Sequence, residues 1–202
     1  MPGEHYFSSQ PTSGHRWREI VADLGGRGMR LLTDAGVFAR GGIDRGTRRL
    51  IENLAVPPGA RRLVDLGCGY GPIGLALAAM APMAEVYLVD VNERACELAR
   101  LNAANNGLSN AIVRLGSGLS ALEGAFDLIA TNPPIRAGKR VVYGLMAEAA
   151  ERLRPGGELW VVARTAQGAL SLARELRRLF PEVEEMAKGG GFRVYRARRG
   201  PV

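Results

Sequence analysis

The fold is decided by the stretch Arg62-Leu63-Val64-Asp65-Leu66-Gly67-Cys68-Gly69-Tyr70-Gly71. Its first half is a short apolar run that predicts a buried strand, and its second half is a glycine-rich turn. A helix is expected to begin at Pro72, because proline suits the first turn of a helix. Strand, glycine-rich turn and helix together indicate a nucleotide-binding arrangement, since residues without a Cβ let the backbone approach a ligand closely.

The acid that leads into this turn narrows the class of ligand. Asp65 stands two residues before Gly67, and the glycine spacing departs from the G-x-G-x-x-G pattern of dinucleotide sites. A pyrophosphate favours a loop without a carboxylate, whereas a cofactor with a cationic amino-acid portion favours one that has it. S-adenosylmethionine (AdoMet) has an ammonium, a sulfonium and no phosphate. A second expected strand, 84–90, ends at Asp90, where an acid can accept hydrogen bonds from both ribose hydroxyls. Asp65 as a loop cap and Asp90 as a helix N-cap are the structural alternatives.

A second motif follows another apolar run, residues 125–131. This motif is Asn132-Pro133-Pro134-Ile135, and ligands of open α/β sheets bind at such carboxyl ends of strands. Its two prolines lock φ and remove two backbone donors, so that rigid carbonyl groups and one amide remain. An exocyclic NH2 group could donate to the Asn132 side-chain oxygen and to the Pro133 carbonyl. Taken alone, the motif is equally typical of a turn that merely ends a strand.

Strand and helix patterns alternate from residue 61 onward. The expected strands are 61–66, 84–90, 110–115, 125–131, 157–164, 182–188 and 192–198. The expected helices are 72–81, 93–106, 138–153 and 167–180. This alternation predicts an α/β fold with a mostly parallel sheet covered by helices on both faces. The last two strands are too close for a crossover helix and predict an antiparallel C-terminal hairpin.

Residues 1–56 are interpreted as an N-terminal segment packed on a main domain of residues 57–202. Pro57-Pro58-Gly59 separates the two parts. Within the first part the sequence predicts two short strands and then an amphipathic helix with Asp44 as its N-cap, at residues 31–33, 37–38 and 44–54.

Composition bounds the class of protein. The chain has 202 residues, 47% of them hydrophobic and 6% aromatic, which favours one aliphatic α/β core. No apolar run reaches the length of a membrane span and no signal peptide is recognisable, so a cytoplasmic location is expected. A net charge of +7 fits a polyanionic partner. The cysteines Cys68 and Cys96 lack metal-ligand spacing, and neither a metal site nor a disulfide is predicted.

The motifs resemble those of class I AdoMet-dependent methyltransferases that act on amino groups. Within this group the similarity is greatest to the catalytic domain of small-subunit ribosomal RNA guanine-N2 methyltransferases and their single-domain archaeal-type relatives. It covers the chain from about His5 to Arg198, with support from Gly36-Val37-Phe38, residues 44–47 and residues 155–160. The resemblance implies a Rossmann-like sheet of seven strands, AdoMet as cofactor, and methyl transfer to an exocyclic amine in RNA, above all guanine N2 of ribosomal RNA.

The resemblance also assigns roles to residues. The implied catalytic residues are Asn132, Pro133, Pro134 and Ile135. The implied cofactor-binding residues are Asp65, Gly67, Cys68, Gly69, Tyr70, Gly71, Asp90, Val91, Ser117 and again Asn132. Implied contacts to the substrate come from Phe38, Arg136 and Lys139, for which core packing and a solvated helical turn are equally open interpretations. Direct in-line attack of the amine on the sulfonium methyl needs no strong base, so no catalytic His or Cys is expected.

Two departures from the family pattern affect the substrate and the cofactor. Ile135 stands where relatives that methylate adenine or glutamine have an aromatic ring, which favours the guanine-N2 group. Gly118 stands where relatives have an acid that accepts from the adenine amine, so Ser117 or a backbone carbonyl is the expected substitute. Two other interpretations stay open: methylation of a protein amide or small amine, and a catalytically silent RNA-binding assembly factor. The chain is expected to be a monomer or a homodimer.

Overall fold

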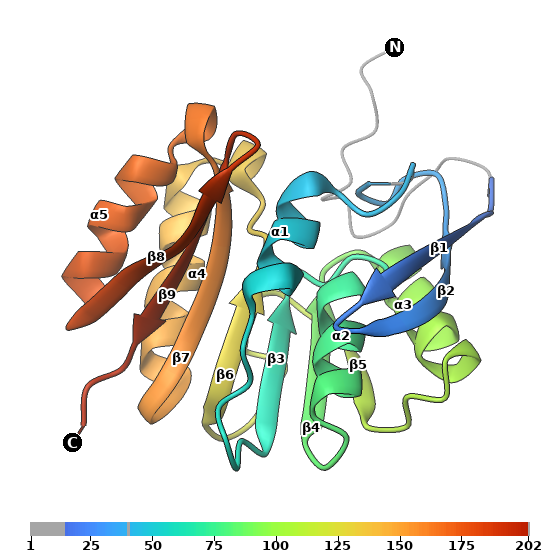
Figure 1. The fold of residues 1–202 in the computed structure, drawn as a ribbon, viewed down its shortest axis with the longest axis horizontal. Helices are drawn as coiled ribbons and strands as arrows, with labels where there is room; N and C mark the ends of the chain where they lie inside the picture. The colour runs from blue at the N-terminus through green and yellow to red at the C-terminus, as the bar shows by residue number, and fades with distance from the viewer. Residues whose placement is uncertain (1–14, 40, 202) are drawn as a thin grey trace.

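A mixed sheet of seven strands forms the centre of the computed structural model, which describes residues 15–39 and 41–201 (Figure 1). The strands lie in the order β5-β4-β3-β6-β7-β9-β8, and only the pairings of β9 with β7 and β8 are antiparallel. Their bounds are β3 (Arg62–Leu66), β4 (Glu85–Asp90), β5 (Ala111–Leu115), β6 (Phe126–Thr131), β7 (Leu153–Arg164), β8 (Glu182–Gly189) and β9 (Phe192–Arg198). The prediction of a mostly parallel Rossmann-like sheet with an antiparallel C-terminal hairpin is confirmed.

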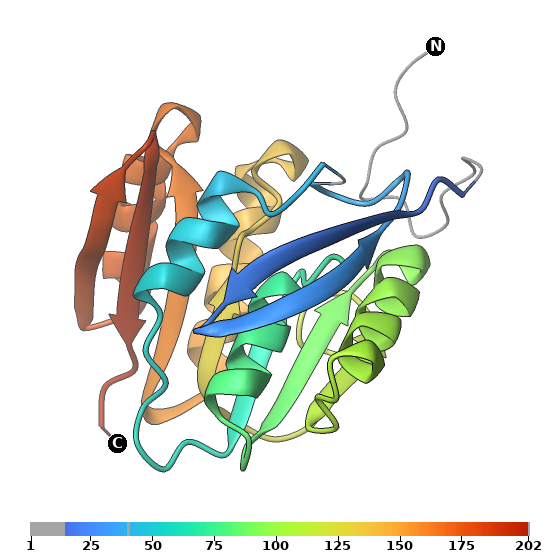
Figure 2. The same ribbon diagram turned by 45° about the vertical axis from the view of Figure 1, so that its right-hand side comes forward.

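Helices cover both faces of this sheet (Figures 1 and 2). They are α1 (Arg45–Asn53), α2 (Pro72–Met80), α3 (Glu93–Asn105), α4 (Lys139–Arg152) and α5 (Ala169–Leu179). The first three pack on one face and the last two on the other. Successive side chains of a strand point to opposite faces of the sheet, so each strand contributes to two separate cores. On β3, Leu63 packs in the core under α1 to α3, and Val64 packs in the core under α4 and α5.

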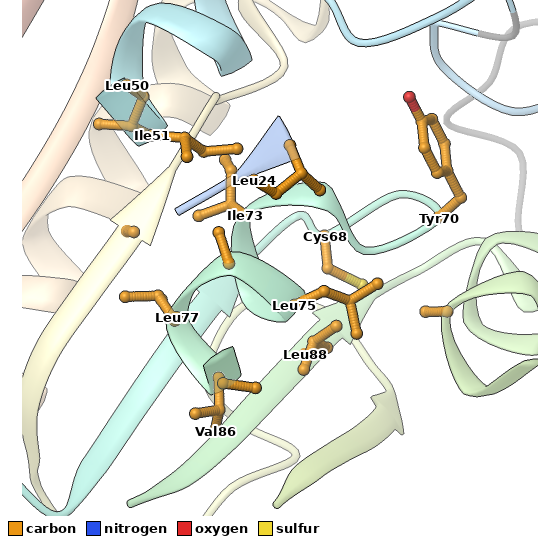
Figure 3. Packing of buried hydrophobic residues seen from close by; sticks show 14 of the residues in the cluster. Leu24, Leu50, Ile51, Cys68, Tyr70, Ile73, Leu75, Leu77, Val86 and Leu88 are labelled. Atoms are coloured by element: carbon orange, nitrogen blue, oxygen red, sulfur yellow. The ribbon is translucent and has the colours of Figure 1, made fainter. Parts of the chain in front are cut away.

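The core beneath the glycine-rich turn is built around α2. Figure 3 shows Leu75 of α2 lying toward Leu88 of β4. Gly74 allows this close approach, because a Cβ at that position would lie 2.4 Å from Leu88 Cγ. The helix is apolar almost all round and is buried at its first seven positions, as expected for a helix enclosed on several sides. The turn that precedes α2 is therefore held on a rigid base.

A separate two-stranded hairpin, β1 (Arg18–Leu24) and β2 (Arg27–Thr33), packs on α2 and α3 (Figure 2). The predicted strand at 37–38 is wrong, since residues 35–38 form turns and bends. The strand that pairs with β2 is β1, which lies upstream of it in the sequence. The two strands are joined by a turn at Gly25 and Gly26, whose φ values are 66° and 82°. Both positive φ values suit glycine, so the Gly25-Gly26 pair is a stronger signal for a hairpin than the turn expected between residues 33 and 37.

Two helix N-termini differ in how well the sequence predicted them. Asp44 caps α1 as expected, accepting from the backbone of Gly46 and Thr47. The N-cap of α3 is Asn92, whose side chain accepts from Ala95 N, so the interpretation of Asp90 as that cap is wrong. Cys68 and Cys96 are both free and buried. Within the described residues no helix has the length and apolarity to cross a membrane. The start of the family resemblance near His5 lies outside the described residues.

Candidate functional site

The two motifs meet where the chain order of the sheet reverses. β3 and β6 pair in parallel, with Val64 opposite Ile129, although β4 and β5 lie between them in sequence. At their carboxyl ends the Thr131 hydroxyl donates a buried 2.7 Å hydrogen bond to Leu66 O. The glycine-rich turn and the Asn-Pro-Pro motif therefore start from one fixed point, the place in an open α/β sheet where ligands bind.

A cavity opens at this edge, named here the glycine-loop pocket. Many of the residues singled out in the sequence line it: Phe38, Gly67, Cys68, Gly69, Tyr70, Asp90, Val91, Ser117, Asn132, Pro133 and Pro134. Val141 and Leu145 of α4 add apolar surface. Gly71 and Asp65 are not part of its wall; Gly71 packs against Leu75 and Leu88, and Asp65 lies beneath the loop.

Two glycines of the loop have a backbone conformation that favours glycine. Gly67 and Gly69 have φ values of 76° and 56°, in the left-handed region. A Cβ on either would meet no atom within 4 Å, so the loop is an open cradle. Its base is fixed, because the backbone N–H groups of Gly67 and Cys68 both donate to Val89 O. A ligand can approach this backbone at van der Waals distance.

Two acids flank the cradle in different surroundings. Asp65 is fully buried, its Oδ2 accepts a 2.7 Å hydrogen bond from Gly74 N, and its Oδ1 has no partner in the described part of the chain. Burial raises the Asp65 pKa to about 7. Asp90 lies on the pocket wall and accepts from Gly69 N at 2.8 Å and Asn92 N at 2.9 Å. Burial raises the Asp90 pKa as well.

Asn132 is held from the N-terminal segment. Its Nδ2 donates to Thr47 Oγ1 at 3.0 Å and to Asp44 Oδ2 at 3.2 Å. Because a carboxylate only accepts, this contact fixes which end of the amide faces α1. The Asn132 Oδ1 atom has no hydrogen-bond partner among residues 15–39 and 41–201. Pro133 O accepts from Ile135 N at 2.8 Å, which leaves one carbonyl lone pair unused. Motif spacing gave no signal for these contacts.

Tyr70 and Asn102 tie the loop to the N-terminal segment. The Tyr70 hydroxyl donates to Gly42 O at 3.1 Å, and burial raises the Tyr70 pKa. The Asn102 amide donates to Tyr70 O and Leu32 O, both at 2.9 Å, and so connects α3, the loop and β2. Asn102 was not found from the sequence, because a single polar residue on a helix resembles any exposed one.

The missing acid after β5 has a structural counterpart on α4. Gly118 lines the glycine-loop pocket with a φ of 62°, and a Cβ there would lie 2.2 Å from Glu148 Oε2. The other carboxylate oxygen, Oε1, accepts a 2.8 Å hydrogen bond from Leu119 N. A carboxylate from a helix thus braces the loop where the family pattern has a loop acid. Ser117 lies on the pocket wall, as its predicted role requires.

A second cavity adjoins the first and is named the arginine pocket. Its wall consists of Phe38, Asp44, Asn132, Pro133, Ile135, Arg136, Arg164, Gln167 and Phe192. The Arg164 guanidinium lies 5.2 Å from the centre of the Phe192 ring. Ile135 and Arg136 face this pocket only, whereas Lys139 is exposed and lines neither cavity. The residues from β7 and β9 had no motif by which the sequence could identify them.

The described residues hold no group of three or more His, Cys, Asp or Glu side chains that could bind a metal ion. Burial raises the pKa of Cys96 to about 11 and raises that of Cys68 well above its usual value. A thiol with a raised pKa is a poor nucleophile near neutral pH. The polar groups described above, Asn132 Oδ1, Pro133 O and the Asp90 carboxylate, are hydrogen-bond acceptors, so the site can bind and align a ligand that donates hydrogen bonds.

Comparisons with known proteins agree with the motifs. The family model of the methyltransferase small domain matches residues 28–196. The "Uncharacterized protein YbxB" of Bacillus subtilis is 38% identical over 198 residues, covering 97% of this chain and 98% of that protein. Ribosomal RNA small subunit methyltransferase C of Pseudomonas entomophila is 35% identical over 184 residues, which are 85% of this chain and 52% of the relative.

A solved structure is similar over nearly the whole chain. The 16S rRNA guanine-N2 methyltransferase of Thermus thermophilus, determined with AdoMet and guanosine, superposes with a TM-score of 0.81 at 29% identity. The match covers 94% of this chain and 52% of that one. This chain thus spans about half the length of the matched ribosomal RNA methyltransferases.

Proposed function

The chain belongs to the methyltransferase small domain family, and from this premise we propose that it methylates the N2 amine of a guanine in ribosomal RNA. Membership gives the class of enzyme, an N-methyltransferase, and AdoMet as the cofactor. The choice of guanine N2 and the roles of single residues rest on the geometry of the two pockets. The similarity to a relative solved with AdoMet and guanosine supports both.

One observation carries the proposal: the fixed orientation of the Asn132 amide. Its Nδ2 is occupied by Thr47 and Asp44, so Oδ1 is the end available to a ligand. An NH2 group that donates to Asn132 Oδ1 and to the second lone pair of Pro133 O is held at two points. These acceptors align the nitrogen lone pair and favour the positive charge that develops on it during transfer.

The glycine-loop pocket fits AdoMet, which when bound supplies an electrophilic methyl group on a sulfonium. The open cradle of Gly67 and Gly69 admits a ligand close to the backbone. The unpaired Oδ1 of Asp65 is a buried acceptor beneath the loop, and a cationic amino-acid portion bound above the loop would favour the ionised form of this carboxyl group. Asp90 would accept from the ribose, and Ser117 and Val91 would contact the adenine.

No residue of this chain has to remove a proton from the amine before the methyl group is transferred. An aryl amine attacks through its neutral lone pair, and the product loses a proton to water once the N–CH3 bond has formed. The described residues around Asn132 accordingly include no His and no reactive thiol: Cys68 lines the pocket, but burial keeps it protonated. Exclusion of water by the apolar wall strengthens the hydrogen bonds that hold the amine.

Transfer of tritiated methyl from AdoMet, followed by digestion to nucleosides, tests this function. The substrates are ribosomal RNA from small and large subunits, transfer RNA and total protein, taken from cells without the gene. We expect label in N2-methylguanosine from ribosomal RNA. Label in protein or in N6-methyladenosine would contradict the guanine assignment, and binding of AdoMet without transfer to any substrate would favour the silent assembly factor.

A further inference from the structure

The two pockets share one wall, formed by Phe38, Asp44, Asn132 and Pro133, which line both cavities. If AdoMet fills the glycine-loop pocket, a base that reaches Asn132 enters from the arginine pocket. These four residues then line the junction at which the methyl donor and the base meet. Its polar side chains are the groups that can distinguish one nucleobase from another at the point of transfer.

Asp44 has an unused acceptor on this wall. Its Oδ2 accepts from Gly46 N at 2.8 Å, Thr47 N at 3.2 Å and Asn132 Nδ2 at 3.2 Å. Its Oδ1 forms no hydrogen bond and no ion pair with any residue that the structure describes. A carboxylate oxygen can only accept hydrogen bonds, so a ligand that pairs with Asp44 Oδ1 must donate from an N–H or O–H group.

Three nucleobases carry an exocyclic amine, and they differ in the ring atom beside it. In adenine and cytosine that ring nitrogen is an acceptor, whereas in guanine N1–H is a donor next to the N2 amine. We propose that Asp44 Oδ1 accepts the N1–H of the target guanine while Asn132 Oδ1 accepts from its N2 amine. Asp44 is thereby the residue that selects guanine, an inference that rests on the proposed function.

The same geometry rejects the other two bases. Adenine or cytosine would place a ring lone pair against a carboxylate oxygen, and neither group could donate. A site built to pair a donor discriminates strongly against analogues that lack it, because its own polar group is then left unpaired. Asp44 is the single acid among the described residues that line the arginine pocket, so no second carboxylate there offsets its effect.

The remainder of the arginine pocket suits a nucleotide. Arg136 and Arg164 form no ion pair within the described ranges, and they lie on the wall away from the glycine-loop pocket. Guanidinium groups bind phosphate oxygens well. Phe192 packs closely on the start of α1, since a Cβ on Gly46 would lie 2.9 Å from its ring. This contact fixes Asp44 relative to Phe192, and the Arg164 guanidinium lies over the ring of Phe192.

Nucleotide binding tests the Asp44 contact directly. The protein is saturated with S-adenosylhomocysteine and titrated with guanosine 5′-monophosphate or 2-aminopurine riboside 5′-monophosphate. The analogue keeps the 2-amine but has an acceptor at N1, and its fluorescence reports binding. Wild type should prefer the guanosine nucleotide by about tenfold or more, the value of a hydrogen bond to a charged group. Asp44→Asn keeps an N-cap oxygen but places an NH2 group at the Oδ1 position, so the preference should disappear or invert.

Glu52→Gln is the matched control, since it removes an exposed carboxylate from the same helix and should keep the wild-type ratio. If Asp44→Asn does not fold, Asp44→Ser retains a capping oxygen and should abolish the preference. No preference in wild type, or an unchanged preference in the Asp44 variants, overturns the contact. Label in a nucleoside other than N2-methylguanosine would instead overturn the proposed function, so the two failures are distinguishable.

Discussion

The Thr131 hydroxyl and the Leu66 carbonyl form a buried 2.7 Å hydrogen bond that joins the ends of β6 and β3. It connects the residue before Asn132 with the residue before Gly67. The spacing between the two motifs therefore depends on a single side chain as well as on the sheet register. A buried carbonyl that loses its only side-chain donor pays a desolvation cost.

We expect Thr131→Val to lower the free energy of unfolding by about 1–3 kcal/mol, because Leu66 O loses a buried donor without regaining water. Urea unfolding monitored by circular dichroism measures the change. Thr33→Val is the matched control: Thr33 Oγ1 is buried without a partner among the described residues, so its removal should be neutral or stabilising. Equal destabilisation by both variants would contradict the importance of the bond.

Asn132→Ala should reduce methyl transfer about a thousandfold or more while AdoMet affinity changes only a few-fold. The substitution removes the acceptor for the amine but leaves the glycine cradle and Asp90 in place. Single-turnover transfer and calorimetry with AdoMet separate the two effects. Asn53→Ala, which removes a side-chain amide from the far end of α1, is the control. Parallel loss of binding and transfer in Asn132→Ala would show that the motif is only structural.

Asp90→Ala should weaken AdoMet binding by about ten- to a hundredfold, because it removes the proposed ribose acceptor and the bond that holds Gly69 N. Asp127→Ala is a suitable comparison, since Asp127 also accepts from two backbone amides, those of Arg61 and Arg62, but lines neither pocket. Both variants should lose stability, and only the first should lose affinity in calorimetry. Unchanged affinity in Asp90→Ala would remove Asp90 from the ribose role.

The Asp65 pKa of about 7 predicts a pH dependence of stability. The folded pKa lies above the usual value of 3.8, so between about pH 4 and 7 the folded state binds more protons than the unfolded state. The Asp65 contribution to stability therefore falls as pH rises through this window. Thermal melts of wild type and Asp65→Asn should diverge, with the wild type losing more from pH 5 to pH 8. Parallel curves would show that Asp65 titrates normally.

The alternating part of the fold was predictable from the sequence because its central strands, β3, β4 and β6, are mostly buried apolar runs that end at a polar or glycine-rich loop. β7 begins at Leu153. The predicted strand began only at residue 157, because residues 153–156 have no apolar pattern that indicates a strand. The end of β2 was predicted at residues 31–33, but β1 was missed, although Ile20, Ala22 and Leu24 alternate, because charged residues flank them.

In the candidate site, too, some features were predictable from the sequence and others were not. The pocket-lining residues that belong to local motifs, Gly67 to Tyr70 and Asn132 to Pro134, were predicted from the sequence. The contacts that orient them join residues far apart, as Asp44 and Asn132 show at a separation of 88 positions. Glu148 behind Gly118 is a further example. Such pairs depend on tertiary packing, and a single sequence has no periodic signal for them.

We propose that this chain places a methyl group on guanine N2 of ribosomal RNA through Asn132. Mass spectrometry of nucleosides from ribosomal RNA tests it most directly, in cells without the gene that are complemented with wild type or Asn132→Ala. We expect the amount of N2-methylguanosine to fall by one residue per ribosome on deletion and to return with the wild-type gene alone. An unchanged amount on deletion, or full restoration by Asn132→Ala, would contradict it.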